Sequence, residues 1–277
     1  MMPQNLISVY TNCYAKYGVE VALENIPKLG IRYVELALKD HRGHLVIPRA
    51  VIPDIFMDVV EIEAFKDRLE ALGLTITSAH GSGDLSTRDG IDAVKARLDF
   101  ASRLGVKIFT TSVAPADAQA TRRELYDSLL HIGDFAAARG VTVSLEVHPG
   151  IVRSGRECLR TMKDLDHDHL RISFDTANIY YYNEDVDAEE ELELIAEYVV
   201  HVHVKDSRRR YREWYFPALG EGTVNLKRVF EILNTVGFCG PFSIEIEGIA
   251  GEEERTLPQI QERLEKSVNH LREVGCL

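Results

Sequence analysis

Short apolar segments typical of β-strands alternate with amphipathic helical segments along the whole chain of 277 residues. The alternation repeats eight times, and several helical segments stop at a glycine, such as Gly30, Gly105 and Gly140, as helices commonly do. Strands separated by helices pair in parallel, because each crossover returns the chain to the same end of the sheet. Strands are predicted at residues 6–9, 31–36, 74–79, 106–113, 141–147, 170–174, 198–204 and 242–246.

Eight strand–helix units in a chain of this length fit a closed (β/α)8 barrel, the α/β architecture called a TIM barrel. An open, doubly wound sheet is the main alternative, but it places a glycine-rich phosphate loop after the first strand. Here the first strand runs into Thr11 and Asn12 instead. We therefore predict a single-domain TIM barrel over residues 1–277. Its helices are predicted at residues 19–29, 61–72, 89–104, 122–139, 156–165, 188–197, 226–236 and 257–274.

Two of the predicted strand-to-helix connections are long, at residues 40–60 and 206–225. In a parallel barrel such connections lie at the carboxyl ends of the strands, where the active sites of these barrels are found. Long loops at that end are suited to cover a substrate. We therefore predict that the two segments contribute a substrate lid.

The chain is acidic, with 44 Asp and Glu residues against 32 Lys and Arg residues and a net charge of −12. This charge disfavours nucleic acid or an anionic membrane as the main partner. The first residues lack the pattern of a signal peptide, and no apolar stretch reaches the ~18 residues of a membrane span. The four cysteines are scattered and form no CxxC pair, which indicates reduced thiols. These features predict a soluble cytoplasmic protein.

Four of the predicted strands end close to a side chain that can bind a metal ion. They are Glu146, Asp175, His203 and Glu245, each about one strand–helix unit or slightly more from the next. Alternate side chains of a strand face one side, so these four can converge at one edge of the sheet. Carboxylates at such a short distance from one another raise each other's pKa unless a cation lies between them. The alternative is that each carboxylate caps the helix that follows it.

The ligand types narrow the choice of ion. Three carboxylates and one imidazole suit Mn²⁺, Mg²⁺, Co²⁺ or Zn²⁺, and they argue against a thiolate site. The two glutamates have a further use, because moving a proton beside a carbonyl group needs a base and, for epimerisation, an acid on the opposite side. Glu146 and Glu245 belong to strands three apart in the predicted barrel, so they can flank a substrate.

Several sequence segments, taken together over essentially the whole chain, resemble the xylose isomerase-like TIM-barrel superfamily of sugar and sugar phosphate isomerases and epimerases, which includes endonuclease IV. The resemblance implies one divalent metal ion, with Mn²⁺ preferred, held by the four side chains above, and it favours His203 over His201 as the imidazole ligand. It also implies that Glu146 and Glu245 are the proton-transferring pair, as in ketose 3-epimerases. The segments are LEVH at 145–148, FDTAN at 174–178, HVHVKD at 201–206, LGEGTVN at 219–225 and GPFSIEIE at 240–247.

Other polar residues share the direction of the ligands and are predicted to contact substrate. His148 follows Glu146 by two positions, and Lys205 follows His203 by two, so both point into the same opening. The alternative for Lys205 is a salt bridge to a ligand carboxylate. His80 ends the third strand, where it can meet a sugar hydroxyl. Glu35, which ends the second strand, is equally suited to pair with a lysine or arginine, and His201 is favoured as a core histidine.

Asn178 departs from the superfamily pattern, in which many members have histidine three residues after the aspartate. Asparagine still donates and accepts hydrogen bonds, but it is a poor metal ligand, so we predict a single metal ion and count Asn178 among the substrate contacts. The segment 207–217 is basic and aromatic. One prediction is that this segment binds a phosphate or carboxylate through Arg209 or a neighbouring arginine and stacks Trp214 on a sugar. The alternative is a solvated turn.

The leading hypothesis is therefore a divalent-metal-dependent isomerase or epimerase of a ketose or keto-sugar. A metal-dependent lyase, of the kind that dehydrates keto-inositols or 3-dehydroshikimate, is the second. Endonuclease activity is disfavoured by Asn178 and by the negative charge, and a non-catalytic sugar-binding protein is the remaining alternative. A small-molecule carbohydrate is the expected partner, and the resemblance also suggests a homodimer.

Overall fold

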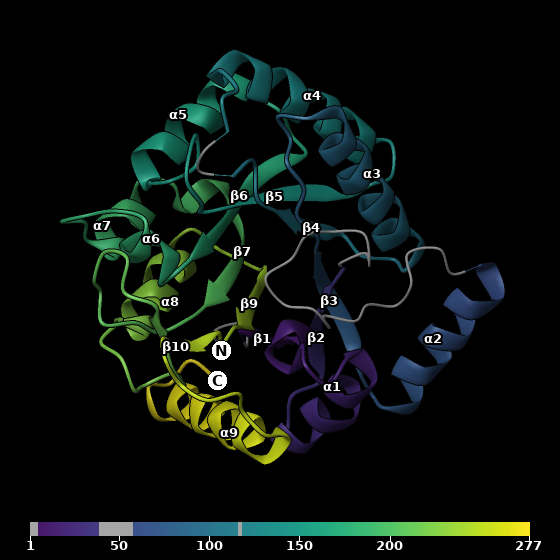
Figure 1. Cartoon of the computed structure of the whole chain (residues 1–277), viewed down its shortest axis with the longest axis vertical. Coiled ribbons are helices and arrows are strands. Elements are labelled where there is room, and N and C mark those ends of the chain that lie inside the picture. Colours follow the sequence, from purple (N-terminus) through teal and green to yellow (C-terminus); the bar gives the residue numbers. More distant parts are fainter. Residues whose placement is uncertain (1–4, 39–57, 116–117) are drawn as a thin grey trace.

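A computed structural model of the protein describes residues 5–38, 58–115 and 118–277. Eight parallel strands close into a barrel in the order β1, β2, β3, β4, β5, β6, β7 and β9, and helices surround it (Figure 1). The predicted single-domain TIM barrel is confirmed. The barrel strands are β1 (Leu6–Tyr10), β2 (Tyr33–Ala37), β3 (Thr75–His80), β4 (Ile108–Thr111), β5 (Thr142–Glu146), β6 (Leu170–Asp175), β7 (Val199–Val204) and β9 (Pro241–Ile244).

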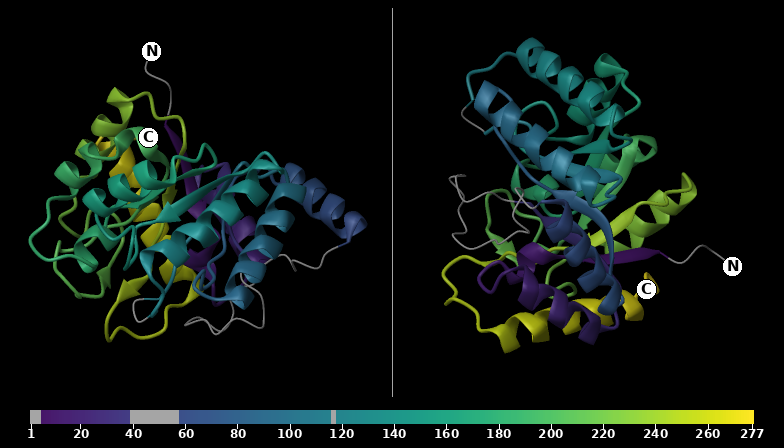
Figure 2. Two further views of the ribbon diagram at one scale, coloured as in Figure 1. Left: turned by 90° about the horizontal axis from the view of Figure 1, so that it is seen from above. Right: turned by 90° about the vertical axis from the view of Figure 1, so that its right-hand side faces the viewer.

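The helices form the outer layer, which the two side views of Figure 2 show around the strands. Several begin at a residue whose side chain accepts a hydrogen bond from the first helical turn; Asp58 and Thr121, for example, form capping boxes. The α-helices are α1 (Val19–Asn25), α2 (Val59–Ala71), α3 (Arg88–Arg103), α4 (Arg122–Ala137), α5 (Gly155–Leu165), α6 (Asn178–Tyr181), α7 (Ala188–Glu193), α8 (Leu226–Thr235) and α9 (Leu257–Glu273).

Polar side chains are buried inside the barrel as well as at its mouth. Thr110 Oγ1 lies 2.8 Å from Ser144 Oγ, which joins β4 to β5. Ser173 Oγ lies 2.8 Å from His201 Nδ1, which joins β6 to β7. Apolar residues at the alternate strand positions belong to the hydrophobic core instead. The barrel interior therefore presents buried polar groups directly below the carboxyl ends of the strands.

Several predicted elements differ in their bounds from the observed ones. The helix expected at 19–29 is α1 followed by the 3-10 helix η2 (Ile26–Leu29), because Pro27 has no N–H to donate to a continuing α-helix. The helix expected at 188–197 ends at Glu193, and a second 3-10 turn, η3 (Ala196–Tyr198), follows. The last barrel strand ends at Ile244, so Glu245 lies just beyond it.

The connection between β7 and α8 contains a strand that the sequence did not predict. In this connection β8 (Tyr215–Phe216) pairs antiparallel with β10 (Gly248–Ile249), which follows β9. The pair joins two segments at the mouth of the barrel. The other predicted lid segment, residues 40–60, falls almost entirely outside the described residues.

Asp206 fixes the course of the connection between β7 and α8. Its buried carboxylate accepts hydrogen bonds from four backbone N–H groups of that connection, and such charge-assisted bonds are stronger than neutral ones. The donors belong to Ser207, Gly220, Gly222 and Val224.

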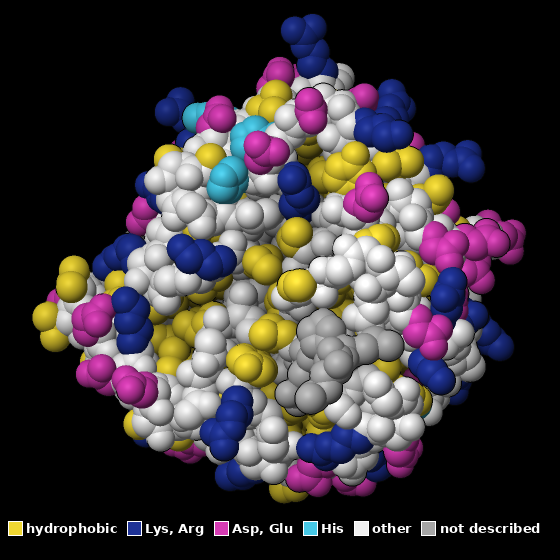
Figure 3. Space-filling model, turned by 180° about the vertical axis from the view of Figure 1, so that it is seen from behind, with side chains coloured by type: hydrophobic (Ala, Val, Ile, Leu, Met, Phe, Trp, Pro, Cys, Tyr) yellow, Lys and Arg dark blue, Asp and Glu magenta, His cyan; other side chains and the backbone are white. Residues whose placement is uncertain are grey.

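The opposite end of the barrel holds the chain ends of the described structure. Asn5 Nδ2, at the start of β1, donates to the carbonyl oxygen of Cys276 at 2.9 Å. Seen from behind, hydrophobic side chains lie toward the centre of this face, and acidic and basic side chains mix around its rim (Figure 3). Within the described ranges, no helix is both long and apolar enough to cross a membrane.

Candidate metal centre

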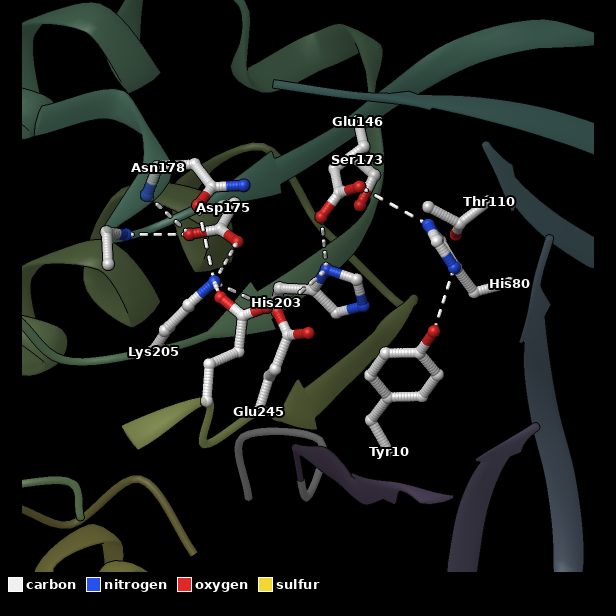
Figure 4. A network of polar contacts seen from close by, with 12 residues as sticks. Tyr10, His80, Thr110, Glu146, Ser173, Asp175, Asn178, His203, Lys205 and Glu245 are labelled. Carbon is white, nitrogen blue, oxygen red and sulfur yellow. Dashed lines mark hydrogen bonds and ion pairs between the residues drawn. The ribbon is translucent and has the colours of Figure 1, made fainter. Parts of the chain in front are cut away.

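The four predicted ligands converge at the carboxyl ends of the barrel strands. Glu146 ends β5, Asp175 ends β6, His203 lies in β7, and Glu245 directly follows β9 (Figure 4). All four are buried, and one ligand atom from each lies within 4.8 Å of one from every other. That spread is close to the ~4 Å between two ligand atoms on opposite sides of one ion. The strands thus bring together the group that the sequence predicted.

Two buried carboxylate oxygens of this cluster test whether a metal ion fits. Asp175 Oδ1 accepts hydrogen bonds from the N–H groups of Ala177 and Asn178 at 2.8 and 2.7 Å, which orients the carboxylate. Asp175 Oδ2 and Glu245 Oε2 have no hydrogen-bond partner among the described residues. Lys205 Nζ lies 3.7 and 3.4 Å from these two oxygens without forming a hydrogen bond to either. Buried anionic oxygens without hydrogen bonds are costly, and a divalent cation would stabilise both. The donor set therefore fits the metal ion that the family resemblance implies.

The charges around His203 show that the cluster attracts a cation. His203 Nδ1 lies 2.8 Å from Glu146 Oε1 and 3.6 Å from Glu245 Oε2. Burial lowers the pKa of His203, but the carboxylates of Glu35, Glu245 and Glu146 outweigh it and raise the pKa well above its ordinary value. Positive charge is thus strongly favoured at this point of the barrel.

The carboxylates of Glu146 and Asp175 differ in their pKa. Burial raises the pKa of Glu146, but His148, His203 and His80 outweigh it and hold the pKa well below its usual value. For Asp175, burial raises the pKa, and the neighbouring carboxylates add to the rise against the effect of a nearby lysine. Glu146 is therefore a carboxylate at neutral pH, whereas Asp175 carries its charge at a free-energy cost that a cation would remove.

Lys205 lies at the same mouth and pairs with the acids there. Its Nζ is 3.4 Å from Glu245 Oε2 and 3.7 Å from Asp175 Oδ2, and it also contacts the carboxylate of Glu247. Asn178 Oδ1 accepts a hydrogen bond from the same ammonium at 3.3 Å (Figure 4). Burial lowers the pKa of Lys205, but Glu245, Glu247 and Asp175 outweigh it and raise the pKa well above normal. The position of Lys205 is thus compatible with both predicted roles, that of a substrate contact and that of an ion-pair partner of a ligand carboxylate.

His80 and His148 both contact Glu146, from different sides. His80 Nε2 lies 3.3 Å and His148 Nδ1 lies 3.2 Å from Glu146 Oε2. His80 Nδ1 in turn lies 2.8 Å from the hydroxyl of Tyr10, whose ring stacks on His203 with the centroids 5.3 Å apart. The sequence prediction did not include Tyr10, although its position at the end of β1 is the signal that would have found it.

Glu35 and His201 lie below the metal-ligand cluster. Glu35 Oε2 is 3.0 Å from His203 Nε2 and 3.3 Å from His201 Nε2, and all three residues are buried. Its described partners are therefore histidines, whereas the sequence suggested lysine or arginine. Burial raises the pKa of Glu35, but the two histidines outweigh it and hold the pKa well below normal. His201 is a core histidine as predicted, with Ser173 as its second partner.

A cavity of about 710 Å³ adjoins the cluster. Trp214, which belongs to its lining, packs edge-on against Phe216 of β8 with the ring centroids 5.0 Å apart. Most predicted substrate contacts share this lining with Glu146 and Glu245. They are His80, His148, Asn178, Lys205 and Trp214.

Arg209 is the predicted contact that the described cavity lining does not include. Its guanidinium lies 3.2 Å from Glu189 Oε1 and over the ring of Tyr180, 5.5 Å from its centroid. Arg208 similarly contacts Glu213 and the ring of Tyr215. Binding of substrate by Arg209 stays a prediction, and the geometry gives this arginine a structural partner.

Comparison with known proteins identifies the family of the chain. The family model described as "Xylose isomerase-like TIM barrel" matches residues 23–274. The chain belongs to this family. One curated relative, inosose dehydratase of Geobacillus thermodenitrificans, is 27% identical over 225 residues, which are 68% of this chain and 74% of the relative. Another, L-ribulose-5-phosphate 3-epimerase of Escherichia coli, is 28% identical over 174 residues, which are 60% of this chain and only 59% of the relative.

Solved structures of the family share the fold over almost the entire chain. A xylose isomerase domain protein from Planctomyces limnophilus has a TM-score of 0.76 and 21% identity, with 99% of this chain and 98% of that chain covered. A xylose isomerase-like TIM barrel protein from Mycobacterium smegmatis, solved in complex with magnesium, has a TM-score of 0.73 and 18% identity, with 97% of both chains covered. At these identities the likeness concerns the fold.

Proposed function

We propose that the protein is a divalent-metal-dependent sugar isomerase or epimerase, with Glu146, Asp175, His203 and Glu245 as the metal ligands. The observation that carries the proposal is the buried cluster itself, in which one ligand atom from each of the four side chains lies within 4.8 Å of the others and two glutamates from different strands line one cavity. Both curated relatives described above act on polyhydroxylated carbon skeletons according to their names, which supports a carbohydrate substrate.

The proposed reaction moves a proton at the carbon atom beside a carbonyl group. Glu146 is the proposed base: it lines the cavity, and the neighbouring histidines lower its pKa, so it is ionised at neutral pH. Glu245, which takes up a proton from solvent before the step, gives that proton to the opposite face of the same carbon atom, and Glu146 then releases its proton to solvent. The metal ion, when bound, polarises the substrate carbonyl as a Lewis acid. Lys205 supplies a fixed positive charge beside Glu245, where negative charge develops on the substrate.

We also infer that the preferred substrate carries no phosphate group. Each lysine and arginine in the described cavity lining already has a partner, and the lining also contains the acidic residue Glu253, which would repel a phosphate. A neutral ketose or keto-polyol needs no free cation in the lining and is not repelled by its acidic residues. The partners are Glu254 for Lys16 at 2.9 Å, Glu245 for Lys205 at 3.4 Å, Glu252 for Arg255 at 3.3 Å and the carbonyl oxygen of Ser82 for Arg97.

Solvent exchange tests the proton transfer directly. The purified protein with Mn²⁺ is incubated with a panel of ketoses in D₂O, and NMR follows deuterium at the carbon next to the carbonyl together with the epimer formed. Glu146→Gln and Glu245→Gln are each expected to slow turnover by about 10²–10⁴-fold, the usual contribution of a general acid or base. Glu253→Gln, a carboxylate of the same cavity lining outside the ligand cluster, is the matched control and should retain activity.

The same assay separates phosphorylated from free sugars. The value of kcat/KM for a free ketose is expected to exceed that for its phosphate ester. A clear preference for the phosphate ester would contradict the inference drawn from the paired cations. Absence of exchange with every sugar would contradict the isomerase proposal and favour a non-catalytic sugar-binding protein.

A lyase is the second candidate function, and the 27% identical inosose dehydratase is the observation that favours it. A lyase would use the same proton abstraction, followed by loss of a β-hydroxyl group as water. Incubation with a keto-inositol or 3-dehydroshikimate would then produce an unsaturated ketone with a new ultraviolet absorbance. Growth of that absorbance, without epimer formation from the ketoses, would replace the isomerase by the lyase.

A further inference from the structure

Glu35 contacts a proposed metal ligand from outside the ligand set. It lies on β2, which in the closed barrel is separated from β7 by β1 and β9 on the shorter side. Its carboxylate nevertheless reaches His203, with Glu35 Oε2 at 3.0 Å from His203 Nε2. Glu35 is fully buried, so this contact is made inside the barrel without competition from solvent.

The two nitrogens of His203 face different surroundings. Nδ1 faces the carboxylates of Glu146 and Glu245, at 2.8 and 3.6 Å. Nε2 faces Glu35, on the other side of the ring. An imidazole that binds a metal ion through one nitrogen carries its proton on the other, and the acceptor of that proton sets the tautomer and the ring orientation.

Glu35 is itself held in place by a second histidine. His201 Nε2 lies 3.3 Å from Glu35 Oε2, and the rings of His201 and His203 meet edge to face with centroids 4.8 Å apart. Ser173 contacts His201 Nδ1 at 2.8 Å and completes the chain of contacts across the barrel. Glu35 thus has a second contact, with His201, that lies outside the metal-ligand cluster.

We propose that Glu35 is a positioning residue for the metal centre. It accepts the Nε2 proton of His203 and thereby presents the Nδ1 lone pair to the site formed with Glu146, Asp175 and Glu245. The inference rests on the proposed metal-dependent function and deepens it, because it assigns the strength of metal binding partly to a strand that contributes no ligand. Outer partners of this kind typically change metal affinity by about 10–100-fold.

Metal binding to the purified apoprotein tests the proposal without any substrate. Affinity for Mn²⁺ is measured by competition with a chromophoric chelator for the wild type, Glu35→Gln and Glu35→Met. The glutamine keeps one neutral oxygen acceptor and is expected to weaken binding about 10-fold, whereas the methionine keeps none and should weaken it about 100-fold. Thr110→Val, which removes a buried hydrogen bond to Ser144 inside the same barrel, is the matched control and should leave the affinity unchanged.

A spectroscopic readout distinguishes positioning from general structural support. In the Zn²⁺-loaded protein labelled with ¹⁵N-histidine, the His203 Nε2–H is expected to give a slowly exchanging NMR signal in the wild type. The signal should exchange faster in Glu35→Gln, even if Glu35→Met fails to fold. Thermal unfolding of the apoproteins provides the measure of structural damage.

The possible outcomes separate this inference from the function on which it rests. Wild-type protein that binds no divalent metal would overturn both. Wild-type binding with unchanged affinity and unchanged Nε2–H exchange in the Glu35 variants would overturn only the positioning role. Two bound ions in the wild type and one in the variants would make Glu35 a ligand of a second ion, and this too would overturn it.

Discussion

The two halves of the barrel contribute different chemistry to one site. The half formed by β5, β6, β7 and β9 provides the candidate ligands, which lie at the strand ends. The half formed by β1, β2 and β3 provides Tyr10, Glu35 and His80, which contact the opposite half: Glu35 and Tyr10 meet His203, and His80 meets Glu146. In the proposed metal centre, one half would bind the ion, and the other would orient the side chains that bind it.

The largest loss of activity and of metal binding is expected from a substitution in the half that provides the candidate ligands. Asp175→Asn should abolish measurable turnover and weaken metal binding by more than the ~100-fold expected for an outer partner. Since burial and the neighbouring carboxylates raise the pKa of Asp175, its charge destabilises the metal-free fold, and the neutral variant should unfold at a higher temperature without metal than the wild type.

Calorimetry with and without a chelator measures both effects of Asp175→Asn. Chelation should lower the Tm of the wild type and leave that of the variant unchanged, because only the wild type gains stability from bound metal. A variant that binds Mn²⁺ as tightly as the wild type would remove Asp175 from the ligand set and end the proposed division between the halves.

A smaller effect is expected from His80 in the partner half. His80→Leu removes the contact of Nε2 with Glu146 Oε2, so it should lower kcat/KM by about 10–100-fold while metal affinity changes less than in Asp175→Asn. Steady-state kinetics together with the chelator competition gives both numbers. Metal affinity lost to the same extent as in Asp175→Asn would make His80 equivalent to a ligand.

Tyr10 should contribute less again, because it acts through His80. Tyr10→Phe keeps the ring that stacks on His203 and removes only the hydroxyl that contacts His80 Nδ1 at 2.8 Å. We expect less than about a 10-fold loss of kcat/KM and about 1 kcal/mol of stability. Tyr14→Phe is the matched control, since its hydroxyl donates at the same distance, 2.8 Å, to Gln261. Equal losses of activity in the two variants would show that the Tyr10 hydroxyl has no specific role.

The smallest change in stability and activity is expected from a substitution outside both halves of the site. Arg209→Gln removes a partly exposed ion pair with Glu189, and such pairs contribute at most about 1 kcal/mol to stability. The KM for a neutral ketose should stay unchanged. A marked rise in KM would indicate that Arg209 contacts substrate and that the site extends beyond these two halves of the barrel.

The ligand half was accessible from the sequence for a physical reason. Each candidate ligand lies at or next to the end of an apolar strand, and the two-residue periodicity of a strand predicts its direction without knowledge of the neighbouring strands. This periodicity predicts the direction of Glu146, Asp175, His203 and Glu245, whereas the family resemblance is what favours His203 over His201 on the same strand face. The boundaries were less predictable, as the break of the first helix at Pro27 and the unpredicted β8–β10 pair illustrate.

The roles of Tyr10, Glu35 and His80, in the half formed by β1, β2 and β3, could not be predicted in this way, because they depend on contacts between distant parts of the chain. Glu35 and His203 are 168 positions apart, and Tyr10 and His80 are 70 positions apart. No local pattern reports such a pairing, because it arises only when the barrel closes and the strands acquire a fixed register. For the same reason the sequence left Glu35 with lysine or arginine as its expected partner and left Tyr10 out.

The sequence by itself predicted the barrel and the carboxylates and histidines at its mouth, because strand and helix periodicity and the chemistry of each side chain are local properties. The resemblance to a known family added the choice of His203 over His201. Only the tertiary structure decided which groups orient those ligands, that Lys205 is paired with acids at the mouth, and that Arg209 pairs with Glu189. These depend on which side chains meet across the closed barrel, and burial then sets the strength of each contact.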